Sequence, residues 1–299
     1  MNYLKTSEIR KCINKYLIRE VSPFDRKLLD FIETSTKFWN FYRIKSLAFK
    51  ILFGSLKSVS RVNSSYTQAW STNQFPGRKD IRSKNYLLWR DKILEVRDWG
   101  EKRVHLHILS RTITSTKIKT YLEVGCGNGA MLMMLSTMHP DVDFVGIELT
   151  EQGVASAKKM QSLRYLPAGM IEFIPEKIMD ASAFKRVTFL QGNAASMPFK
   201  KNKFDLVSTT LALEQMSAVQ EVALKEISRV SKNYISLLEP FPDFNQTKLR
   251  KAYTKAREYF SIPTTELNLF GLRVLYVFDN FPSKINRGTA FVLAKKTKI

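Results

Sequence analysis

The sequence predicts an α/β fold in which strands and helices alternate around a doubly wound, mostly parallel sheet. The first observation is the segment 121–131, YLEVGCGNGAM, where an apolar strand runs into three alternating glycines and then an apolar helix. The second is the apolar run 143–149, DFVGIEL, which contains an acidic residue near its end. The third is that strand patterns recur at 187–190, 204–207 and 234–238. Strands that alternate with helices in this way build a parallel sheet.

The glycine loop, residues 125–129, indicates a nucleotide-like ligand. Only residues without a Cβ turn this sharply and let a ligand lie against main-chain N–H groups. Glu148 ends the second strand nineteen positions after Gly129, and an acidic side chain there can accept hydrogen bonds from both hydroxyls of a ribose. The spacing E-x-G-x-G-x-G differs from the dinucleotide-binding fingerprint. The two features together predict a nucleoside cofactor.

At these residues the sequence resembles the class I S-adenosylmethionine-dependent methyltransferases. The motifs occur in the order of that family, at 123–129, at Glu148, at 192–194 and at 204–207, and the segment 211–216, LALEQM, resembles the motif after the fourth strand. The resemblance implies a Rossmann-like, mostly parallel seven-stranded sheet that ends in an antiparallel hairpin. It also implies S-adenosyl-L-methionine as the cofactor.

The resemblance implies which residues hold the cofactor. Glu123 and the glycine loop would hold the methionine portion, Glu148 the ribose, and Asn193 with the Ala194 backbone the adenine. The full expected set is Glu123, Gly125, Cys126, Gly127, Gly129, Glu148, Leu149, Asn193, Ala194 and Thr210. The family commonly has Asp where Asn193 stands, and the amide oxygen of Asn can still accept a hydrogen bond. The usual His is replaced by Gln215, which cannot titrate near neutral pH.

Methyl transfer from a sulfonium needs orientation and a competent nucleophile more than elaborate proton machinery. Glu214, just past the fourth strand, is the candidate catalytic residue, and structural hydrogen bonding is the alternative. The family's Asn/Asp-Pro-Pro-Tyr/Phe tetrad is absent, because the residues there are STTLALEQ. The resemblance therefore argues against adenine-N6, cytosine-N4 and glutamine-N5 methylation. It favours methyl transfer to an oxygen or nitrogen of a small, anionic or lipophilic metabolite.

Residues 1–115 are expected to form a basic, mainly helical extension or lid, and residues 116–299 the catalytic domain. Helical patterns cover 7–36 and 85–110, and a polar loop is predicted at 60–80.

The net charge of +21 lies mostly in the N-terminal part, where residues 1–119 hold 25 Lys and Arg against 10 Asp and Glu. Such a charge favours anionic partners, and a solvated basic surface is the alternative. The segment 38–59 interleaves aromatic and basic residues, as does a helix that lies on an anionic membrane; core or lid packing and nucleic-acid contact are the other interpretations. RNA methylation is the alternative function, although the sequence has no RNA-binding module signature.

Two insertions interrupt the catalytic domain, at 164–185 and 241–263. The first is expected at the sheet edge away from the cofactor, where a dimer or partner contact is the better interpretation. The second, basic and aromatic, returns to the carboxyl edge of the sheet and is expected to be a substrate lid, with an ordinary covering helix as the alternative. The candidate substrate-binding residues are Tyr66, Trp70, Lys248 and Tyr253.

The two cysteines, Cys12 and Cys126, predict a reducing, cytoplasmic setting, because a disulfide at Cys126 would obstruct the glycine loop. Neither a signal peptide nor a membrane-spanning run is expected. His105 and His107 lie two positions apart, on different faces of a helix, so no metal site is predicted. A third function class is a catalytically degenerate subunit that binds the cofactor and pairs with an active partner. It is motivated by Asn193 and Gln215, the two positions that depart from the family.

Overall fold

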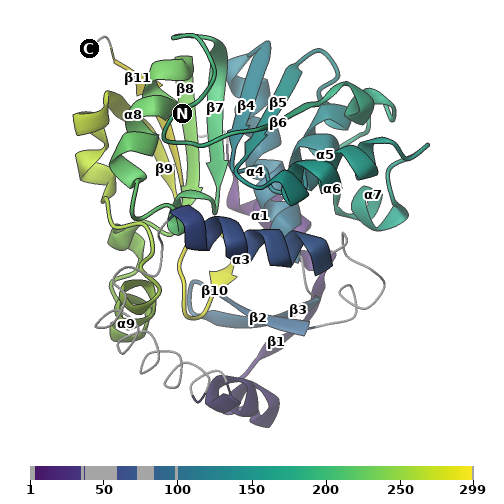
Figure 1. Cartoon of the computed structure of the whole chain (residues 1–299). Coiled ribbons are helices and arrows are strands. Elements are labelled where there is room, and N and C mark those ends of the chain that lie inside the picture. Colours follow the sequence, from purple (N-terminus) through teal and green to yellow (C-terminus); the bar gives the residue numbers. More distant parts are fainter. Residues whose placement is uncertain (1–3, 35–36, 38–58, 73–83, 98–99, 298–299) are drawn as a thin grey trace.

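The computed structural model describes residues 4–34, 37, 59–72, 84–97 and 100–297. These residues form a seven-stranded sheet in the order β6-β5-β4-β7-β8-β11-β9 and a four-stranded sheet in the order β1-β3-β2-β10. Figure 1 shows the smaller sheet lying below the lower edge of the larger one.

The larger sheet is parallel except at one end. Its parallel strands are β4 (Thr120–Val124), β5 (Asp143–Glu148), β6 (Thr188–Gln191), β7 (Phe204–Thr210) and β8 (Ser231–Glu239). At one end, β11 (Ala290–Lys296) lies antiparallel to both β8 and β9 (Leu272–Phe278). The predicted doubly wound, mostly parallel seven-stranded sheet with a final antiparallel hairpin is therefore confirmed.

Helices cover both faces of this sheet (Figure 1). One face packs on α4 (Gly100–Thr116), α5 (Ala130–Met138), α6 (Glu151–Gln161) and α7 (Ala168–Phe173), and the other on α8 (Gln220–Val230) and the 3-10 helix η4 (Thr264–Phe270). Tyr121 and Leu122 are neighbours on β4 and both are fully buried, each in a different cluster. Successive side chains of a strand point to opposite faces, which is why central strands of such sheets read as unbroken apolar runs.

The described residues of the N-terminal part include strands as well as helices, whereas the sequence predicted a mainly helical extension. The helix α1 (Thr6–Asn14) is followed by the strand β1 (Leu17–Val21), and residues 26–34 form a further helix. Of the helix predicted at 85–110, residues up to 97 instead form the hairpin of β2 (Lys84–Trp89) and β3 (Lys92–Arg97), and residues 100–110 lie in α4.

The apolar residues of this hairpin alternate between its two faces. Leu87 and Leu94 pack toward α1 and α4, whereas Tyr86 and Ile93 belong to a cluster on the opposite face. Arg90, with φ at 56°, makes the tight connection between the strands. The short strand β10 (Ser283–Lys284), from the connection between β9 and β11, pairs with β2 and completes the smaller sheet.

The helix α3 (Val59–Thr72) replaces most of the predicted loop at 60–80. It lies across the lower edge of the large sheet, between the two sheets (Figure 1). The Thr67 hydroxyl donates to the side-chain oxygen of Gln152 on α6. The aromatic and basic segment up to residue 58, with its membrane and lid interpretations, lies outside the described residues.

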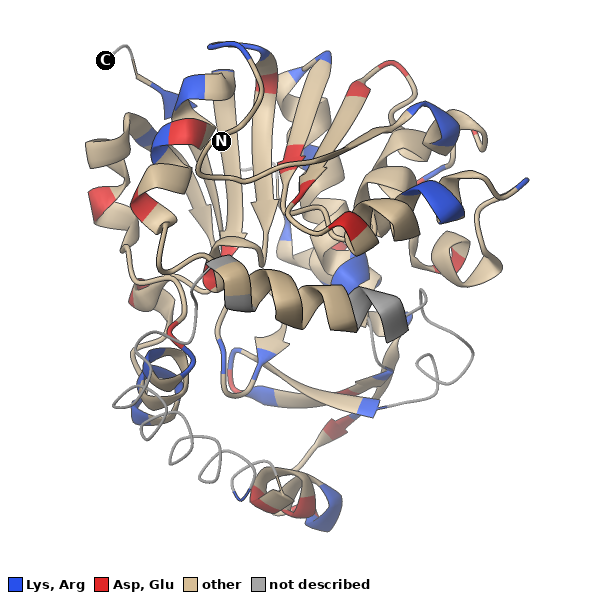
Figure 2. Cartoon of the chain, viewed as in Figure 1, with Lys and Arg blue, Asp and Glu red and all other residues tan. Residues whose placement is uncertain are grey.

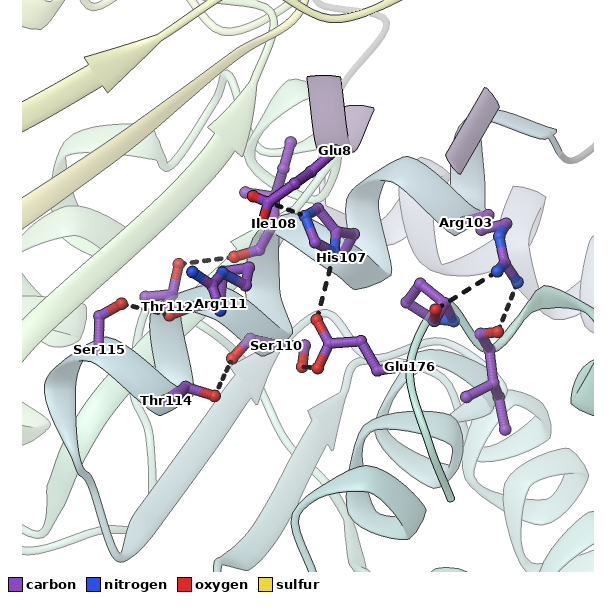
Figure 3. Close-up of polar contacts among 12 residues, drawn as sticks. Glu8, Arg103, His107, Ile108, Ser110, Arg111, Thr112, Thr114, Ser115 and Glu176 are labelled. Atoms are coloured by element: carbon purple, nitrogen blue, oxygen red, sulfur yellow. Dashed lines mark hydrogen bonds and ion pairs between the residues drawn. The ribbon is translucent and has the colours of Figure 1, made fainter. Parts of the chain in front are cut away.

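The first insertion is fastened to α4 (Figure 3). Arg103 donates to three main-chain carbonyls of the insertion, and the Ser110 hydroxyl donates to Glu176 at 2.7 Å. The ring nitrogens of His107 lie 3.2 Å from Glu176 and 3.6 Å from Glu8 of α1. Both histidines of α4 are buried, and the described residues hold no group of side chains that could bind a metal ion.

Within the part of the chain that is described, no helix combines the length and the apolar character needed to cross a membrane.

Candidate functional site

The glycine loop joins β4 to α5, and its three glycines adopt positive φ. Gly125, Gly127 and Gly129 have φ values of 77°, 55° and 72°, a region that other residues rarely adopt. Space is a second constraint, since a Cβ on Gly129 would lie 2.3 Å from the Phe189 ring. The Gly125 N–H donates to the Ile147 carbonyl at 2.8 Å. These contacts fix the loop against β5, at the carboxyl edge of the sheet.

Glu148 ends β5 and is buried behind the glycine loop. One carboxylate oxygen accepts from the Gly127 N–H at 3.0 Å, and the other from the Thr150 N–H and hydroxyl at 3.1 and 2.8 Å. Thr150 also caps α6 by accepting from the Gly153 N–H. A carboxylate has about four lone-pair positions. Glu148 therefore organises the loop and keeps acceptor capacity for a ligand hydroxyl.

A cavity of about 320 Å³ opens at the carboxyl ends of β4, β5 and β7. The strand order reverses between β4 and β7, and open α/β sheets bind ligands at such a point. Val62 and Tyr66 of α3 line one side. Of the expected cofactor residues, Gly129 is the one outside the lining, and the cavity is lined by Glu123, Gly125, Cys126, Gly127, Glu148, Leu149, Asn193, Ala194 and Thr210.

Asn193 and Ala194 line the cavity just after β6. The Asn193 side-chain oxygen accepts from the Ala195 N–H at 2.9 Å. An amide oxygen has two lone pairs, so one remains for an amino group of a ligand. The replacement of the family's usual Asp therefore leaves an acceptor at this position.

Glu123 presents a buried carboxylate to the same cavity. Burial raises its pKa to about 7, against the opposing effects of Lys102 and of a hydrogen bond with Thr210. One of its oxygens has no hydrogen-bond partner among the described residues. A buried polar group without a partner costs free energy, so Glu123 is suited to accept from a ligand donor. Burial also raises the pKa of the Cys126 thiol, which is therefore neutral.

Glu214 lies in the 3-10 helix η2 (Leu213–Gln215) that follows β7. Arg287 donates to both of its carboxylate oxygens, at 2.8 and 2.6 Å, and the Gln215 amide donates to one of them at 3.0 Å. Both charged side chains are buried, and the guanidinium lies over the Tyr259 ring. These contacts fit the alternative role considered for Glu214, structural hydrogen bonding. A catalytic role for Glu214 stays a prediction.

Glu239, the last residue of β8, also binds the loop that carries Glu214. Its carboxylate accepts from the N–H groups of Ala212, Leu213 and Glu214, at 2.9, 3.1 and 3.3 Å. Burial raises the pKa of Glu239 to about 8, and the nearby Glu214 adds to this shift. The wall of the cavity after β7 is therefore fixed by two separate acidic side chains.

The candidate substrate residues are not all brought together. Tyr66 lines the cavity, and burial raises the pKa of its phenol. Trp70 lies in the same helix, and its side chain is outside the described part of the structure. Lys248 and Tyr253, on α9 (Lys248–Ala256), lie outside the cavity lining. Tyr253 instead packs edge-on against the Tyr259 ring, with centroids 5.9 Å apart.

The second insertion contacts the connection between β9 and β11. Arg250 of α9 donates to the carbonyls of Lys284 and Ile285 at 3.2 Å. The Asn245 side chain donates to the Gly288 carbonyl and accepts from the Gly288 N–H. The insertion therefore supports the segment that carries the guanidinium paired with Glu214.

Sequence reasoning missed several residues around the cavity. Lys102 lies in the first turn of α4, and nothing in its helical pattern showed that this end reaches the glycine loop. Arg287 lies 73 positions from its partner Glu214, in the final hairpin connection, without a motif around it. Other lining residues that were not predicted are Val62, Asn128, Met131, Met216 and Val219.

The fold and the site define a class of protein: an α/β domain that binds a nucleoside cofactor on a glycine loop at the switch point of its sheet. Residues 115–260 match a family model described as a methyltransferase domain. The matched residues form a methyltransferase domain, and they contain the glycine loop and Glu148, at which the sequence resembles the class I S-adenosylmethionine-dependent methyltransferases.

Curated relatives match parts of the chain. The demethylmenaquinone methyltransferase of Lactococcus lactis subsp. lactis (strain IL1403) is 31% identical over 181 residues, which are 59% of this chain and 58% of that protein. The phthiotriol/phenolphthiotriol dimycocerosates methyltransferase of Mycobacterium tuberculosis (strain ATCC 25618 / H37Rv) is 29% identical over 108 residues, 35% of this chain and 32% of that protein. The chain thus spans 32% to 58% of the length of these relatives.

Among solved structures, the geranyl diphosphate C-methyltransferase from Streptomyces coelicolor A3(2) is similar in fold. That structure is a complex with Mg²⁺, geranyl diphosphate and S-adenosyl-L-homocysteine. The TM-score is 0.51 at 11% sequence identity, over 79% of this chain and 98% of that chain. At this identity the likeness concerns the fold alone.

The residues around the cavity fit S-adenosylmethionine. Glu148 keeps acceptor capacity for ribose hydroxyls, and Gly125, Gly127 and Gly129 have no Cβ that would keep a ligand from the main chain. The carboxylate oxygen of Glu123 that lacks a partner can accept from the α-ammonium group of a methionine portion. The site therefore offers an acceptor for each of these donors of the cofactor.

Proposed function

We propose that the chain transfers the methyl group of S-adenosylmethionine to an oxygen or nitrogen of a small, lipophilic molecule. The observation that carries the proposal is that one cavity joins Glu148 and the glycine loop to an apolar wall. That wall includes Val62 on α3 and Met216 and Val219 after β7. An apolar wall favours a lipophilic acceptor, because its burial removes apolar surface from water.

The names of the curated relatives support a small lipophilic acceptor. One is named for demethylmenaquinone and the other for phthiotriol dimycocerosates. For the present chain, the acceptor and its accepting atom belong to the proposal.

The chain's part in the reaction is to orient and to exclude water. When bound, the cofactor would supply an electrophilic methyl group and leave as the neutral thioether S-adenosylhomocysteine, and the proton of the accepting hydroxyl or amine would pass to water. Tyr66 and Val62 of α3 would cover the reacting groups, since they line the cavity opposite the sheet. Glu214, held by Arg287, would accept a hydrogen bond from a hydroxyl or amine of the acceptor. Such positioning supplies much of the rate of an in-line displacement.

Calorimetric titration with S-adenosylmethionine and S-adenosylhomocysteine tests the cofactor site. We expect wild type to bind both, and Glu148→Ala to lose about tenfold or more in affinity, because buried donors of the loop lose their acceptor. Asp141→Ala, at an exposed acidic residue outside the lining, is the matched control. Folded wild-type protein that binds neither compound would overturn the proposal.

Incubation with labelled S-adenosylmethionine and cell extract tests the acceptor. We expect label in the organic-solvent fraction, where lipophilic small molecules collect. Label released by ribonuclease would instead support RNA methylation, which the net charge of +21 favours. Cofactor binding without transfer to any fraction would favour the degenerate partner subunit.

We place this reaction in the cytoplasm, because Cys12 and Cys126 are free and buried. Peripheral contact with an anionic membrane through the segment before α3, and homo-oligomer formation, stay predictions. Fractionation with anionic vesicles and light scattering of the purified protein measure the two.

A further inference from the structure

The helix α9 of the second insertion has one face turned toward the protein. Its sequence, KLRKAYTKA, contains four basic residues and no acidic one. Arg250 donates to two main-chain carbonyls of the connection between β9 and β11, and the Tyr253 ring packs against Tyr259. Residues three and four positions apart share a face of a helix. Arg250 and Tyr253 therefore mark the inner face of α9.

The other face of α9 presents three lysines to solvent. Lys248, Lys251 and Lys255 are all exposed, and their spacing of three and four positions places them in one row, the lysine stripe. Leu249 follows the first of them and is 49% exposed. Both acidic residues of the insertion, at positions 243 and 258, lie outside α9. The helix thus combines a row of positive charge with an exposed apolar side chain.

The position of the lysine stripe indicates what kind of partner it fits. The cavity has no residue of α9 in its lining. Figure 2 shows basic residues gathered on α9, below the carboxyl edge of the large sheet, the edge at which the cavity lies. The stripe extends over seven residue steps, or about 10 Å along the helix. This arrangement suits an extended anionic surface better than a small ion.

The exposed apolar side chains favour a bilayer as that surface. A second copy of the chain would bring a further net charge of +21 and be repelled. Phe24 is 86% exposed, and Leu29 and Ile32 of the helix 26–34 are exposed as well. Figure 1 shows this helix, in purple, on the same side of the large sheet as α9. Lysines beside exposed apolar side chains are typical of surfaces that bind anionic lipid.

We propose that the lysine stripe binds the anionic headgroups of a bilayer, with Leu249 at the boundary of the acyl chains. This surface is separate from the segment 38–58, for which the sequence predicts membrane contact. The use of such binding rests on the proposed function, because a lipophilic acceptor collects in a bilayer rather than in water. Docking through α9 brings the carboxyl side of the large sheet, and with it the cavity, to that membrane.

Sedimentation with vesicles measures the binding of the full chain. We expect wild type to bind vesicles of phosphatidylglycerol and phosphatidylcholine, and to be released by added salt, which screens the charges. The triple variant Lys248→Gln, Lys251→Gln, Lys255→Gln should partition about a hundredfold more weakly, since each lysine near an anionic surface contributes about fivefold. Glutamine is about as good a helix former as lysine, so the variant keeps α9.

A second triple variant is the matched control. Lys200, Lys201 and Lys203 are exposed and lie just before β7, at the amino edge of the large sheet. Their replacement by Gln removes the same charge from the opposite edge, and it should change the partition by less than about threefold. Both triple variants should bind S-adenosylhomocysteine as wild type does, because neither set of lysines lines the cavity.

A fluorescent label locates α9 relative to the lipid. Cys12 and Cys126 are buried, so an environment-sensitive fluorophore can be attached selectively to Leu249→Cys. We expect its emission to shift to shorter wavelength when anionic vesicles are added. The same label on Lys201→Cys should show no such shift.

Three results overturn the inference and leave the proposed function standing. The first is wild-type protein that binds RNA but no anionic vesicles, which would assign the lysine stripe to nucleic acid. The second is an α9 variant that partitions like wild type, which would assign the binding to another surface, such as the segment 38–58. The third is unchanged emission from the label at position 249 on vesicle-bound protein. Vesicle binding through α9 by a protein that does not bind S-adenosylhomocysteine would instead overturn the proposed function.

Discussion

The substitution Gly125→Ala tests how the glycine loop is held against the wall after β7. At φ of 77° an alanine carries a backbone strain of about 1–2 kcal/mol. Its Cβ would also lie 2.6 Å from the Cβ of Ala212, an overpacking that costs about 1–3 kcal/mol. We therefore expect Gly125→Ala to lower the free energy of unfolding by about 2–5 kcal/mol.

The two costs separate in a double-mutant cycle with Ala212→Gly. Removing the Cβ of Ala212 relieves the clash and leaves the backbone strain, so the double variant should be more stable than the sum of the single changes by about 1–3 kcal/mol. Ala212→Gly by itself should cost about 0.5–1 kcal/mol.

Urea unfolding monitored by circular dichroism gives each free energy, and equal m values show that the denatured state is unchanged. The affinities of the variants for S-adenosylhomocysteine, measured by titration, should fall in the same order as their free energies of unfolding. Additive losses would refute the contact between the two loops. A Gly125→Ala protein as stable as wild type would refute the need for glycine at this φ.

Three further expectations concern ionisable side chains that are buried or half-buried. Arg287→Met should lower the free energy of unfolding, measured in urea, by about 3–5 kcal/mol, because it leaves Glu214 buried and unpaired. The double variant Arg287→Met with Glu214→Leu should recover most of this free energy. An unchanged free energy of unfolding in the single variant would contradict the buried pair. Glu239 has its pKa raised from 4.5 to about 8, so its contribution to stability is complete below pH 4.5 and is lost as the pH rises to about 8, by up to about 1.4 kcal/mol per pH unit. Glu239→Gln should flatten that slope, and parallel curves for the two proteins would argue against a protonated Glu239. Arg103→Met should cost about 1–3 kcal/mol and speed proteolysis of the first insertion, because main-chain carbonyls lose a donor; the exposed Arg164→Met is the control, and equal cleavage rates would contradict this role.

The sequence predicted best what the main chain itself requires. Glycines at positive φ and an acidic residue at a strand end leave local patterns, so the glycine loop and Glu148 could be placed by residue number. The mostly parallel seven-stranded sheet followed from the resemblance, and the structure confirms it.

The N-terminal sheet could not be predicted in the same way. The apolar residues of 84–97 fit a helical period as well as an alternating one, so their pattern alone does not distinguish a helix from a hairpin. Two tertiary contacts stabilise the hairpin. One of its faces is buried against α1 and α4, and the edge formed by β2 pairs with β10. Neither of these partners is visible in a local window of sequence.

The wall of the cavity shows a further limit. Glu214 was predicted from its place after the fourth strand, but its partner Arg287 lies in a connection with no motif. An ion pair of this kind depends on the packing of the final hairpin against β8, which no spacing rule describes. Lys102 was hidden for the same reason, since only tertiary packing directs the first turn of α4 toward the cavity.

The pairing of β2 with β10 has a consequence for synthesis on the ribosome. Leu88 pairs with Ser283, 195 positions later in the chain. At elongation rates of about 5–20 residues per second, the outer edge of β2 waits about 10–40 s for its partner. An open strand edge is a template for pairing with another chain. The nascent protein therefore carries an open, aggregation-prone strand edge until Ser283 and Lys284 have been made and can pair with β2.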